Sequence, residues 1–274
     1  MAAATAATAT AALVVPLVVP LPPLPPTSPF GFVKPAAWPD MALFQKIQYY
    51  KRHIGPAFAP YVDKIEAKRL VKDLGGDEVE VAPLVRILDG PDDLRAEDLD
   101  TGVMVKASHG CGWNINVGPT TTLASAKAAL HRWNRVYEGQ DEPHYGYLTP
   151  RFFIERKIDD VYTGVSGNAV VFLIRCLHGQ PFAIGVRKGN RQNSYSVDWE
   201  LIKTAEMPPV EKPKAFEKML SVARRLSAPF EFVRVDVYLG AGDAVYFSEF
   251  TFTPSAGAPF YPIKEECALG RLWQ

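Results

Sequence analysis

The chain has 274 residues, of which 47% are hydrophobic and 22% are charged, a composition typical of a globular enzyme that excludes a disordered chain. Thirty Lys and Arg residues balance thirty Asp and Glu residues, so the overall charge gives no reason to expect nucleic acid or an anionic membrane as a partner. Any anion-binding site must be built locally.

Cysteine and histidine spacing argues against disulfides and zinc. The three cysteines, Cys111, Cys176 and Cys267, are far apart and form no Cys-x-x-Cys pair. This pattern fits a reducing compartment, and we expect a cytoplasmic protein. The five histidines do not fall at metal-ligand spacing with each other or with cysteine, so no zinc site is expected.

The N-terminal segment differs in composition from the rest. Residues 1–33 contain no charged residue, whereas a signal peptide opens with a basic region. Pro16 interrupts the apolar run Leu13–Val19, which is too short for a membrane span. We therefore expect no integral membrane segment. Residues 1–40 are predicted to be a disordered Ala/Pro-rich tail or a mis-assigned translation start, with Met41 as an alternative start.

The first part of the chain predicts helices followed by short strands. Apolar residues recur at helical spacing in two stretches, and Gly75-Gly76 stops the second one. In chain order we expect helices at Met41–His53 and Val62–Leu74, one or two strands within Val79–Leu88 around Pro83, an acidic loop with a short helical turn at 89–101, strands at Val103–Lys106 and Ile115–Val117, and a helix at Leu123–Tyr137.

The second part is richer in strands. Its expected elements are strands at Arg151–Ile158, Ala169–Leu177 and Gln180–Arg187, a helix at Lys214–Leu226, and a hairpin formed by Phe230–Leu239 and Ala244–Phe252. Strands and helices mix without a regular βαβ alternation, so the predicted fold class is α+β.

Two stretches carry candidate chemistry. Lys106 ends an apolar strand and precedes the glycine loop Ser-His-Gly-Cys-Gly-Trp, a position with no packing reason for a charge. In the hairpin, Arg234 and Asp236 share one face, as do Glu249 and Thr251 on the second arm. Carboxylates on rigid strands suit Mg²⁺. The alternative is an exposed sheet face with a salt bridge between Arg234 and Glu249.

The order and spacing of these motifs resemble the ATP-grasp superfamily, and more narrowly its TupA-like branch, associated with teichuronopeptide and other surface-polysaccharide synthesis. The stretches that carry the resemblance are YVDKIEAKRLVKDLGG, VKASHGCGWNINV and VRVDVY…VYFSEFTFTPSAG, within residues 45–270. It implies an ATP-grasp fold at 41–274, in which two α/β subdomains, 41–150 and 151–274, enclose a nucleotide cleft and the N-terminal region is reduced.

The resemblance also implies residue roles. Lys64 and Lys106 would reach the ATP phosphates, and Arg234 would face the transferred phosphoryl group. Asp236 and Glu249 would hold Mg²⁺. Thr251 stands where the superfamily commonly has asparagine, which leaves a second metal position open. The loop over the triphosphate would be His109, Gly110, Cys111 and Gly112, and the hinge that meets adenine and ribose would be Glu155, Arg156, Lys157 and Ile158, with Asp159 or Asp160 as a ribose partner.

The implied activity is an ATP- and Mg²⁺-dependent carboxylate–amine ligase in cell-surface polymer biosynthesis, acting on a small-molecule carboxylate and an amine or polysaccharide-linked acceptor. Two alternatives remain open. A kinase acting on a sugar hydroxyl would need a general base, for which His109 is the obvious candidate. A non-catalytic nucleotide-binding module of a polysaccharide-assembly complex is favoured by Thr251. The basic cluster Arg187, Lys188 and Arg191 is either a solvated loop or a contact for phosphate or an anionic acceptor.

Overall fold

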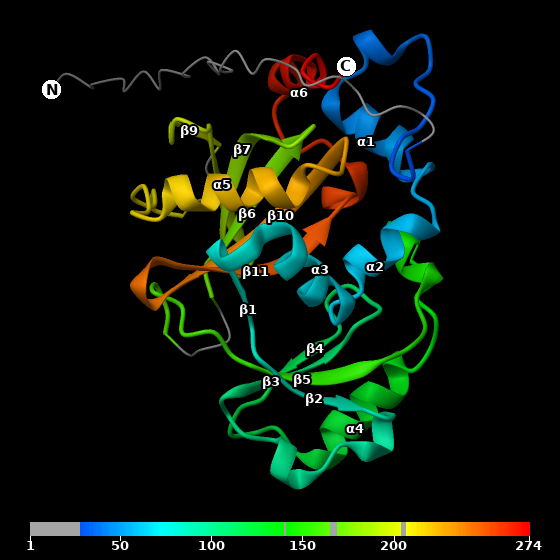
Figure 1. Cartoon of the computed structure of the whole chain (residues 1–274), viewed down its shortest axis with the longest axis vertical. Coiled ribbons are helices and arrows are strands. Elements are labelled where there is room, and N and C mark those ends of the chain that lie inside the picture. The colour runs from blue at the N-terminus through cyan, green and yellow to red at the C-terminus, as the bar shows by residue number, and fades with distance from the viewer. Residues whose placement is uncertain (1–27, 140, 165–168, 204–206) are drawn as a thin grey trace, which may run out of the picture.

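A computed structural model describes residues 28–139, 141–164, 169–203 and 207–274, and these form two β-sheets with helices around them (Figure 1). The large sheet has the strand order β1-β11-β10-β6-β7-β8-β9, and the small sheet has the order β2-β5-β3-β4. The predicted α+β class is confirmed. The strands are β1 (Val79–Val81), β2 (Leu84–Leu88), β3 (Val103–Ala107), β4 (Asn114–Asn116), β5 (Phe152–Arg156), β6 (Val171–Leu177), β7 (Gln180–Lys188), β8 (Arg191–Tyr195), β9 (Leu201–Lys203), β10 (Phe232–Gly240) and β11 (Ala244–Thr251).

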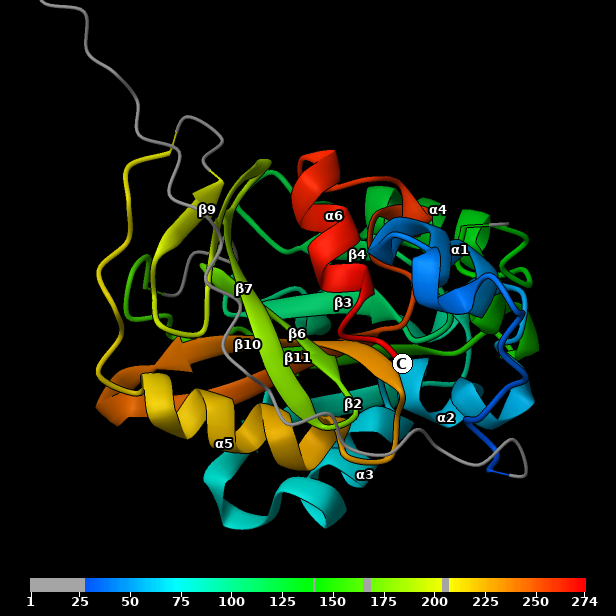
Figure 2. The same ribbon diagram turned by 90° about the horizontal axis from the view of Figure 1, so that it is seen from above.

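Helices cover both faces of the large sheet. They are α1 (Leu43–Lys51), α2 (Ala59–Val62), α3 (Glu66–Gly75), α4 (Leu123–Trp133), α5 (Phe216–Ser227) and α6 (Ile263–Gly270). Figure 2 shows α5 on one side of this sheet and α6 on the opposite side. Among the described helices, none is long and apolar enough to cross a membrane.

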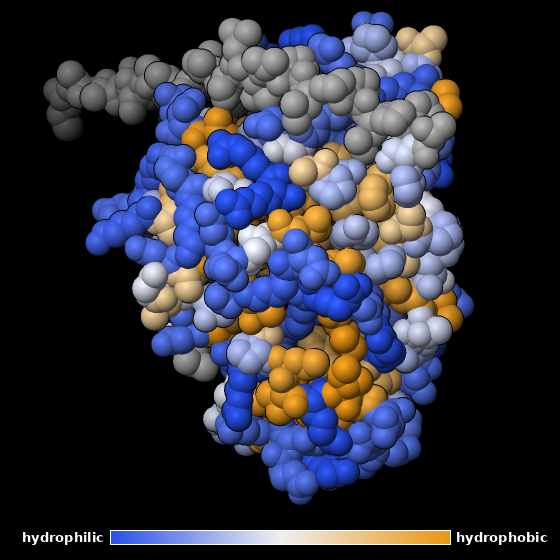
Figure 3. Space-filling model, viewed as in Figure 1, coloured by the Kyte–Doolittle hydropathy of each residue, from blue (hydrophilic) through white to orange (hydrophobic). Residues whose placement is uncertain are grey.

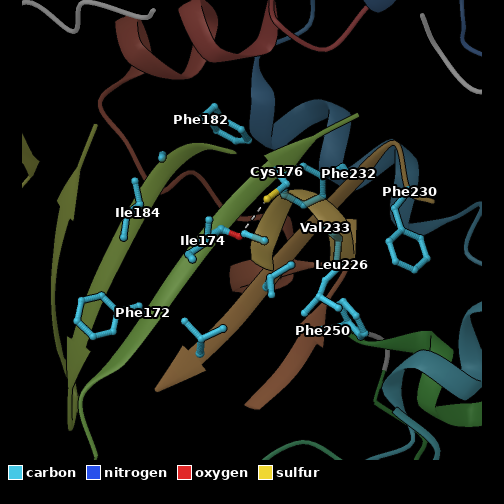
Figure 4. Close-up of a cluster of buried hydrophobic side chains, with 14 of the residues drawn as sticks. Phe172, Ile174, Cys176, Phe182, Ile184, Leu226, Phe230, Phe232, Val233 and Phe250 are labelled. Carbon is cyan, nitrogen blue, oxygen red and sulfur yellow. Dashed lines mark hydrogen bonds between the residues drawn. The ribbon is translucent and has the colours of Figure 1, made fainter. Parts of the chain in front are cut away.

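Side-chain alternation along β6 and β10 separates an apolar face from a face on which Arg175, Arg234 and Asp236 lie. Phe172, Ile174 and Val233 are fully buried and point toward α5, where Leu226 meets them (Figure 4). Because successive side chains of a strand point to opposite faces, the polar residues between them, Arg175 among them, face the other way. One face of the large sheet therefore packs against α5. The face with Arg175, Arg234 and Asp236 lies on the side of α6.

The chain passes from the large sheet to the small one at Pro83. Strand β1 lies parallel to β11, whereas β2 pairs antiparallel with β5. Pro83 has no N–H to contribute to a ladder, but its carbonyl accepts a hydrogen bond from Arg156 N at 2.9 Å. The region expected to hold one or two strands around Pro83 thus holds two, and they belong to different sheets.

The predicted division of the chain at residues 150 and 151 does not coincide with the sheets. Strand β5 lies inside the small sheet, between β2 and β3, whereas β1 lies at the edge of the large sheet. The small subdomain therefore spans residues 84–156 and is inserted between β1 and β6. The apolar run Phe152, Phe153 and Ile154 is fully buried there, which explains why β5 completes the small sheet.

The expectation of a disordered tail is wrong for residues 28–40. Phe32 and Trp38 are buried in the core, and Trp38 Nε1 donates a hydrogen bond of 2.8 Å to the carbonyl of Trp273. Trp273, near the C-terminus, is itself fully buried. This segment docks because its aromatic residues find apolar partners at the opposite end of the chain. Residues 1–27, the rest of the predicted tail, lie outside the described residues.

The helix predicted at Val62–Leu74 starts later, at Glu66, and the break that precedes it matters for the site. Asp63 has ψ 115° and ends α2, while its Oδ1 accepts hydrogen bonds from the backbone N–H groups of Ile65 and Glu66 at 2.8 and 3.1 Å. An aspartate that caps a helix in this way competes with helix continuation. Lys64 consequently lies in an irregular turn between α2 and α3. The short strands β8 and β9 and helix α6 were not predicted.

The outer strand of the small sheet carries an apolar surface. Leu84, Val85 and Ile87 of β2 are 43%, 47% and 45% exposed. In Figure 3, hydrophobic residues gather over the lower part of the molecule, where the small sheet lies. Strand β2 is an edge strand, and no described segment covers these three side chains.

Candidate nucleotide-binding site

A pocket lies between the two sheets and is lined by residues of both. The small sheet and the segment after it contribute Met104, Lys106 and residues 155–158, and the large sheet contributes Tyr238. Ala82 and Ala169 complete the lining. A concave site with apolar walls and a few charged groups is the usual form of a small-ligand site.

Two lysines clamp the buried carboxylate of Glu155. Lys106 Nζ lies 2.5 Å from Oε1, and Lys68 Nζ, on α3, lies 2.7 Å from Oε2. Burial alone would raise the pKa of Glu155, but the two ammonium groups lower it below its ordinary value. Glu155 is therefore ionised and fixes Lys106 at the pocket. Lys68 was not singled out from the sequence, since a lysine on an amphipathic helix normally faces solvent.

The expected hinge residues line the pocket mainly through backbone and apolar groups. Lys157 Nζ donates to the carbonyls of Thr101 and Val117 at 2.6 and 2.7 Å, and Arg156 lies 3.5 Å from Asp100. Both charges are therefore used within the small subdomain. Ile158 and the hinge backbone remain as the surface that a flat ring system would meet.

Asp159 and Asp160 do not line this pocket. Asp160 Oδ2 instead accepts hydrogen bonds from Tyr162 N, Thr163 Oγ1 and Val170 N at 3.2, 2.7 and 3.3 Å. These contacts tie together the two ends of the loop that follows the hinge. Asp160 was expected to contact ribose, but its side chain instead binds groups of this loop.

The β10–β11 hairpin places four polar side chains on one face. Asp236 lies opposite Glu249, and Arg234 lies opposite Thr251. Arg234 Nε and Nη2 each donate to Asp236 at 2.6 Å, and Nη2 also donates to Thr251 Oγ1 at 3.0 Å and lies 3.8 Å from Glu249. Arg234 is 8% exposed and Asp236 is fully buried, so the alternative of an exposed, solvated face is wrong.

Glu249 is the point on which cations converge. Burial would raise its pKa, but four basic side chains lower it: Lys64, Arg234, Arg187 and Lys106. They come from the turn after α2 and from β10, β7 and β3. The same burial raises the pKa of Asp236 to about 6, with Arg234 acting in the opposite direction. This arrangement suits a polyphosphate that is bound to a divalent cation. The basic side chains would bind the phosphate oxygens, and the two carboxylates would bind the cation.

The glycine loop is attached to the break between α2 and α3. Lys64 Nζ donates to the carbonyl of Gly110 at 2.5 Å, and Lys64 N donates to the carbonyl of Ser108 at 3.2 Å. Gly112 has φ +68°, and a Cβ on Gly110 would lie 2.4 Å from the Trp113 ring. Glycine is thus required at both positions. Desolvation and the nearby Glu142 raise the pKa of the Cys111 thiol to about 12, so this cysteine is not a nucleophile.

His109 does not reach the cleft, contrary to its expected roles in phosphate binding and proton transfer. Its ring is fully buried; Arg151 N donates to Nδ1 at 3.1 Å, and Nε2 donates to the carbonyl of Trp133 at 2.8 Å. Burial also lowers the pKa of the imidazole. Both ring nitrogens are engaged with backbone, so His109 anchors the loop from behind.

The expected magnesium ligands suit an ion that is shared with a nucleotide. No group of three or more His, Cys, Asp or Glu side chains is arranged to hold a metal ion in the part of the chain that the structure describes. Asp236 and Glu249 nevertheless provide two carboxylates on adjacent strands, and Mg²⁺ is commonly held by one or two carboxylates plus phosphate oxygens. The hydroxyl of Thr251 accepts a hydrogen bond from Arg234. Thr251 therefore helps to orient Arg234, whether or not a second metal ion binds.

Two sheets around a charged cleft, with basic groups aimed at two carboxylates, define an ATP-grasp protein. A model of the TupA-like ATP-grasp family matches residues 45–274. The chain belongs to the TupA-like ATP-grasp family. The residues quoted for the resemblance lie within this match.

Comparison with solved structures returns several enzymes of low sequence identity. An L-amino acid ligase from Bacillus licheniformis matches with TM-score 0.49 and 13% identity over 77% of this chain and 47% of that one. Biotin carboxylase from Campylobacter jejuni, solved with a β-γ-ATP compound, matches with TM-score 0.47 and 14% identity over 80% and 48%. The ADP complex of N5-carboxyaminoimidazole ribonucleotide synthetase matches with TM-score 0.47 and 12% identity over 77% and 51%. The chain therefore spans about half the length of these relatives. No curated protein matches it significantly.

Proposed function

We propose that the protein is an ATP- and Mg²⁺-dependent carboxylate–amine ligase that works through an acyl phosphate. The observation that carries this proposal is the arrangement of Arg234 with the facing carboxylates Asp236 and Glu249, which it meets at 2.6 and 3.8 Å. Against the effect of burial, Lys64, Arg187 and Lys106 also lower the pKa of Glu249. These side chains supply what phosphoryl transfer to a carboxylate requires, which is positioning and charge stabilisation with no protein nucleophile.

In this mechanism the substrate carboxylate attacks the γ-phosphorus of ATP, the bond to the bridging oxygen breaks, and ADP leaves. Lys64 and Lys106 bind the phosphates, and Arg234, oriented by its two bonds to Asp236, stabilises the charge of the transferred group. Asp236 and Glu249 would hold Mg²⁺, which neutralises phosphate charge. The amine then bonds to the acyl carbon, inorganic phosphate leaves, and the amine releases a proton.

The kinase alternative is weakened by the position of His109. A carboxylate is ionised at neutral pH, with an ordinary pKa of about 4, whereas a sugar hydroxyl must lose a proton as it attacks. The residue considered for that base has both ring nitrogens engaged with backbone. The binding-module alternative rests on Thr251, whose hydroxyl has a partner in Arg234.

The setting that we propose, assembly of a cell-surface polymer in the cytoplasm, rests on the resemblance alone. The acceptor would be an amine or a polysaccharide-linked amine, and nucleic acid is not proposed as a partner.

The test is ADP release from Mg²⁺-ATP across a panel of uronic acids and amino acids, with hydroxylamine added as a trap. The expected result is a hydroxamate together with ADP and phosphate from at least one acid. Stable phosphorylation of a neutral sugar with no hydroxamate from any acid would favour the kinase. Bound ATP that is never cleaved would favour the binding module.

A further inference from the structure

Next to the hairpin face lies a cluster of polar side chains, named here the β6–β8 cluster, that have no hydrogen-bond partner among the described residues. Its unpartnered atoms are Arg175 Nη1, Gln192 Nε2, Ser194 Oγ and Tyr261 Oη. Arg175, Ser194 and Tyr261 are 3%, 0% and 5% exposed. Buried polar groups are nearly always paired, because leaving them unpaired costs free energy. Such a concentration in one place points to a missing partner.

The strand register places this cluster on the same face as the hairpin site. Arg175 lies directly opposite Arg234 in the β6–β10 ladder, and directly opposite residues share a face with Cβ atoms about 5 Å apart. Ser194 lies opposite Gly185, which in turn lies opposite Leu173, the residue that pairs with Asp236. The β6–β8 cluster is therefore a continuation of the site, away from β11.

Gly185 lets the cluster close over β7. A Cβ at this position would lie only 2.7 Å from Gln192 Nε2, so the amide of Gln192 lies across the strand where a side chain would otherwise stand. The Gln192 amide therefore lies over β7, the strand between β8 and β6.

Among the described residues, Arg175 differs from Arg234 in lacking an ion-pair contact. Arg234 is paired with Asp236 at 2.6 Å. Asp236 and Glu266 act on the charge of Arg175 only from a longer distance, and Arg175 Nη1 has no hydrogen-bond partner within the described parts of the chain. Its guanidinium carbon lies 4.7 Å from the ring centre of Phe260 and 5.6 Å from that of Tyr261. Cation–π contact offsets part of the cost of burying this charge, and an anion would offset the rest.

Tyr261 is held in place from behind. Glu266 Oε1 accepts hydrogen bonds from Phe260 N and Tyr261 N at 2.8 and 2.9 Å, and its Oε2 accepts one from Phe44 N at 3.0 Å. Burial raises the pKa of the Tyr261 hydroxyl, while Arg175 and Ser194 lower it, so both are its neighbours. The Ser194 hydroxyl acts on the Tyr261 hydroxyl as a side-chain hydrogen-bonding neighbour, but the two do not meet in the geometry of a regular hydrogen bond.

The chemistry of the cluster selects an acceptor-only, negatively charged group. Guanidinium and amide nitrogens can only donate hydrogen bonds, and the two hydroxyls can donate as well. A carboxylate offers about four lone-pair sites and a negative charge. It complements these donors, whereas a neutral or cationic group would leave Arg175 unpaired.

We propose that the β6–β8 cluster binds the carboxylate of the amine substrate, so that the amine is supplied by an amino acid and not by a simple amine. This inference rests on the proposed ligase function. In an α-amino acid a single carbon separates the amine from the carboxylate. A carboxylate at Arg175 therefore directs the amine toward the acyl phosphate, whose phosphoryl group faces Arg234 on the neighbouring strand.

The experiment measures binding of the twenty L-amino acids to the protein saturated with Mg²⁺ and a non-hydrolysable ATP analogue, by thermal shift and then by calorimetry. Each amino acid that binds is compared with its α-amide. The wild-type protein should prefer the acid over the amide by about 10- to 100-fold, the range for a charge-assisted hydrogen bond. Arg175→Gln should remove this preference and leave affinity for the nucleotide analogue unchanged, whereas the matched control Arg224→Gln, at an exposed position on α5, should retain the preference.

Two further variants separate binding from structure. Tyr261→Phe and Ser194→Ala each remove an unpartnered hydroxyl, so neither should lower the melting temperature of the free protein, but each should weaken amino acid binding about 3- to 10-fold. The proposal is overturned if no amino acid binds, if the amide binds as well as the acid, or if these variants lower stability without changing affinity. Absence of ADP release with every acid would instead refute the ligase function, and Arg175-dependent binding would still stand.

Discussion

Replacing Glu155 with Gln should lower the stability of the folded protein, because the carboxylate of Glu155 is the shared partner of Lys106 and Lys68. The carboxylate oxygens lie 2.5 and 2.7 Å from Lys106 Nζ and Lys68 Nζ. At an effective dielectric constant of 20, each contact has a Coulomb energy of about 6 kcal/mol before desolvation is subtracted. Loss of one partner of a buried pair leaves uncompensated charge and costs about 3–5 kcal/mol. Because the lysines are 21% and 15% exposed, we expect the lower end of that range.

The assay is urea denaturation of Glu155→Gln with and without Mg²⁺-ATP. The matched control is Glu80→Gln, which breaks a pair with Lys72 of 3.0 Å whose side chains are 48% and 41% exposed, and which should cost less than about 1 kcal/mol. Mg²⁺-ATP should restore more stability to Glu155→Gln than to the wild type, since phosphate oxygens replace the lost carboxylate at Lys106. Equal destabilisation by the two substitutions would refute the reasoning that burial makes this clamp strong.

Three further predictions follow from other parts of the molecule. Glu249→Gln should abolish Mg²⁺-dependent ATP cleavage while the nucleotide still binds, because the amide removes a charge that the metal needs; turnover at ordinary Mg²⁺ concentration would show that the hairpin face is only structural. Trp38→Ala should lower the free energy of unfolding by about 3–5 kcal/mol in denaturant titration, since it empties a core site and removes the bond to Trp273; a loss below 1 kcal/mol would mean that this segment is not docked. Burial, with a smaller contribution from Lys64, lowers the pKa of His144 from 6.5 to about 4, so the unfolded chain takes up a proton first and stability falls as the pH drops from 6.5 toward 4, by about 3 kcal/mol. His144→Phe should flatten this part of the stability curve, and an unchanged pH dependence would contradict the assignment.

Local patterns predicted the elements whose structure is decided locally. The hairpin was expected at Phe230–Leu239 and Ala244–Phe252, and it forms at Phe232–Gly240 and Ala244–Thr251, because alternation and a Gly-rich turn are properties of neighbouring residues. The same alternation put Arg234, Asp236, Glu249 and Thr251 on one face.

Features that depend on distant partners could not be predicted in this way. The sequence has no signal that separates β1 from β2 into different sheets, because both are short and apolar and their partners, β11 and β5, lie far along the chain. Lys68 is a pocket residue only because α3 brings it to Glu155. Arg175 is hidden in an apolar strand, and its importance depends on its lack of a hydrogen-bond partner at Nη1 among the described residues, which only the folded chain reveals.

The attachment of the small subdomain has a mechanical consequence. The chain enters it through Pro83 and leaves it after Arg156, and these two crossings are joined by the hydrogen bond from Arg156 N to the carbonyl of Pro83. A second attachment lies at the glycine loop, where Lys64 donates to the carbonyls of Gly110 and Ser108. The pocket lies between these two attachments, with Lys106 in the small subdomain and Tyr238 in the large sheet. Under the proposed function, a nucleotide bound there would contact both parts and stabilise their relative position.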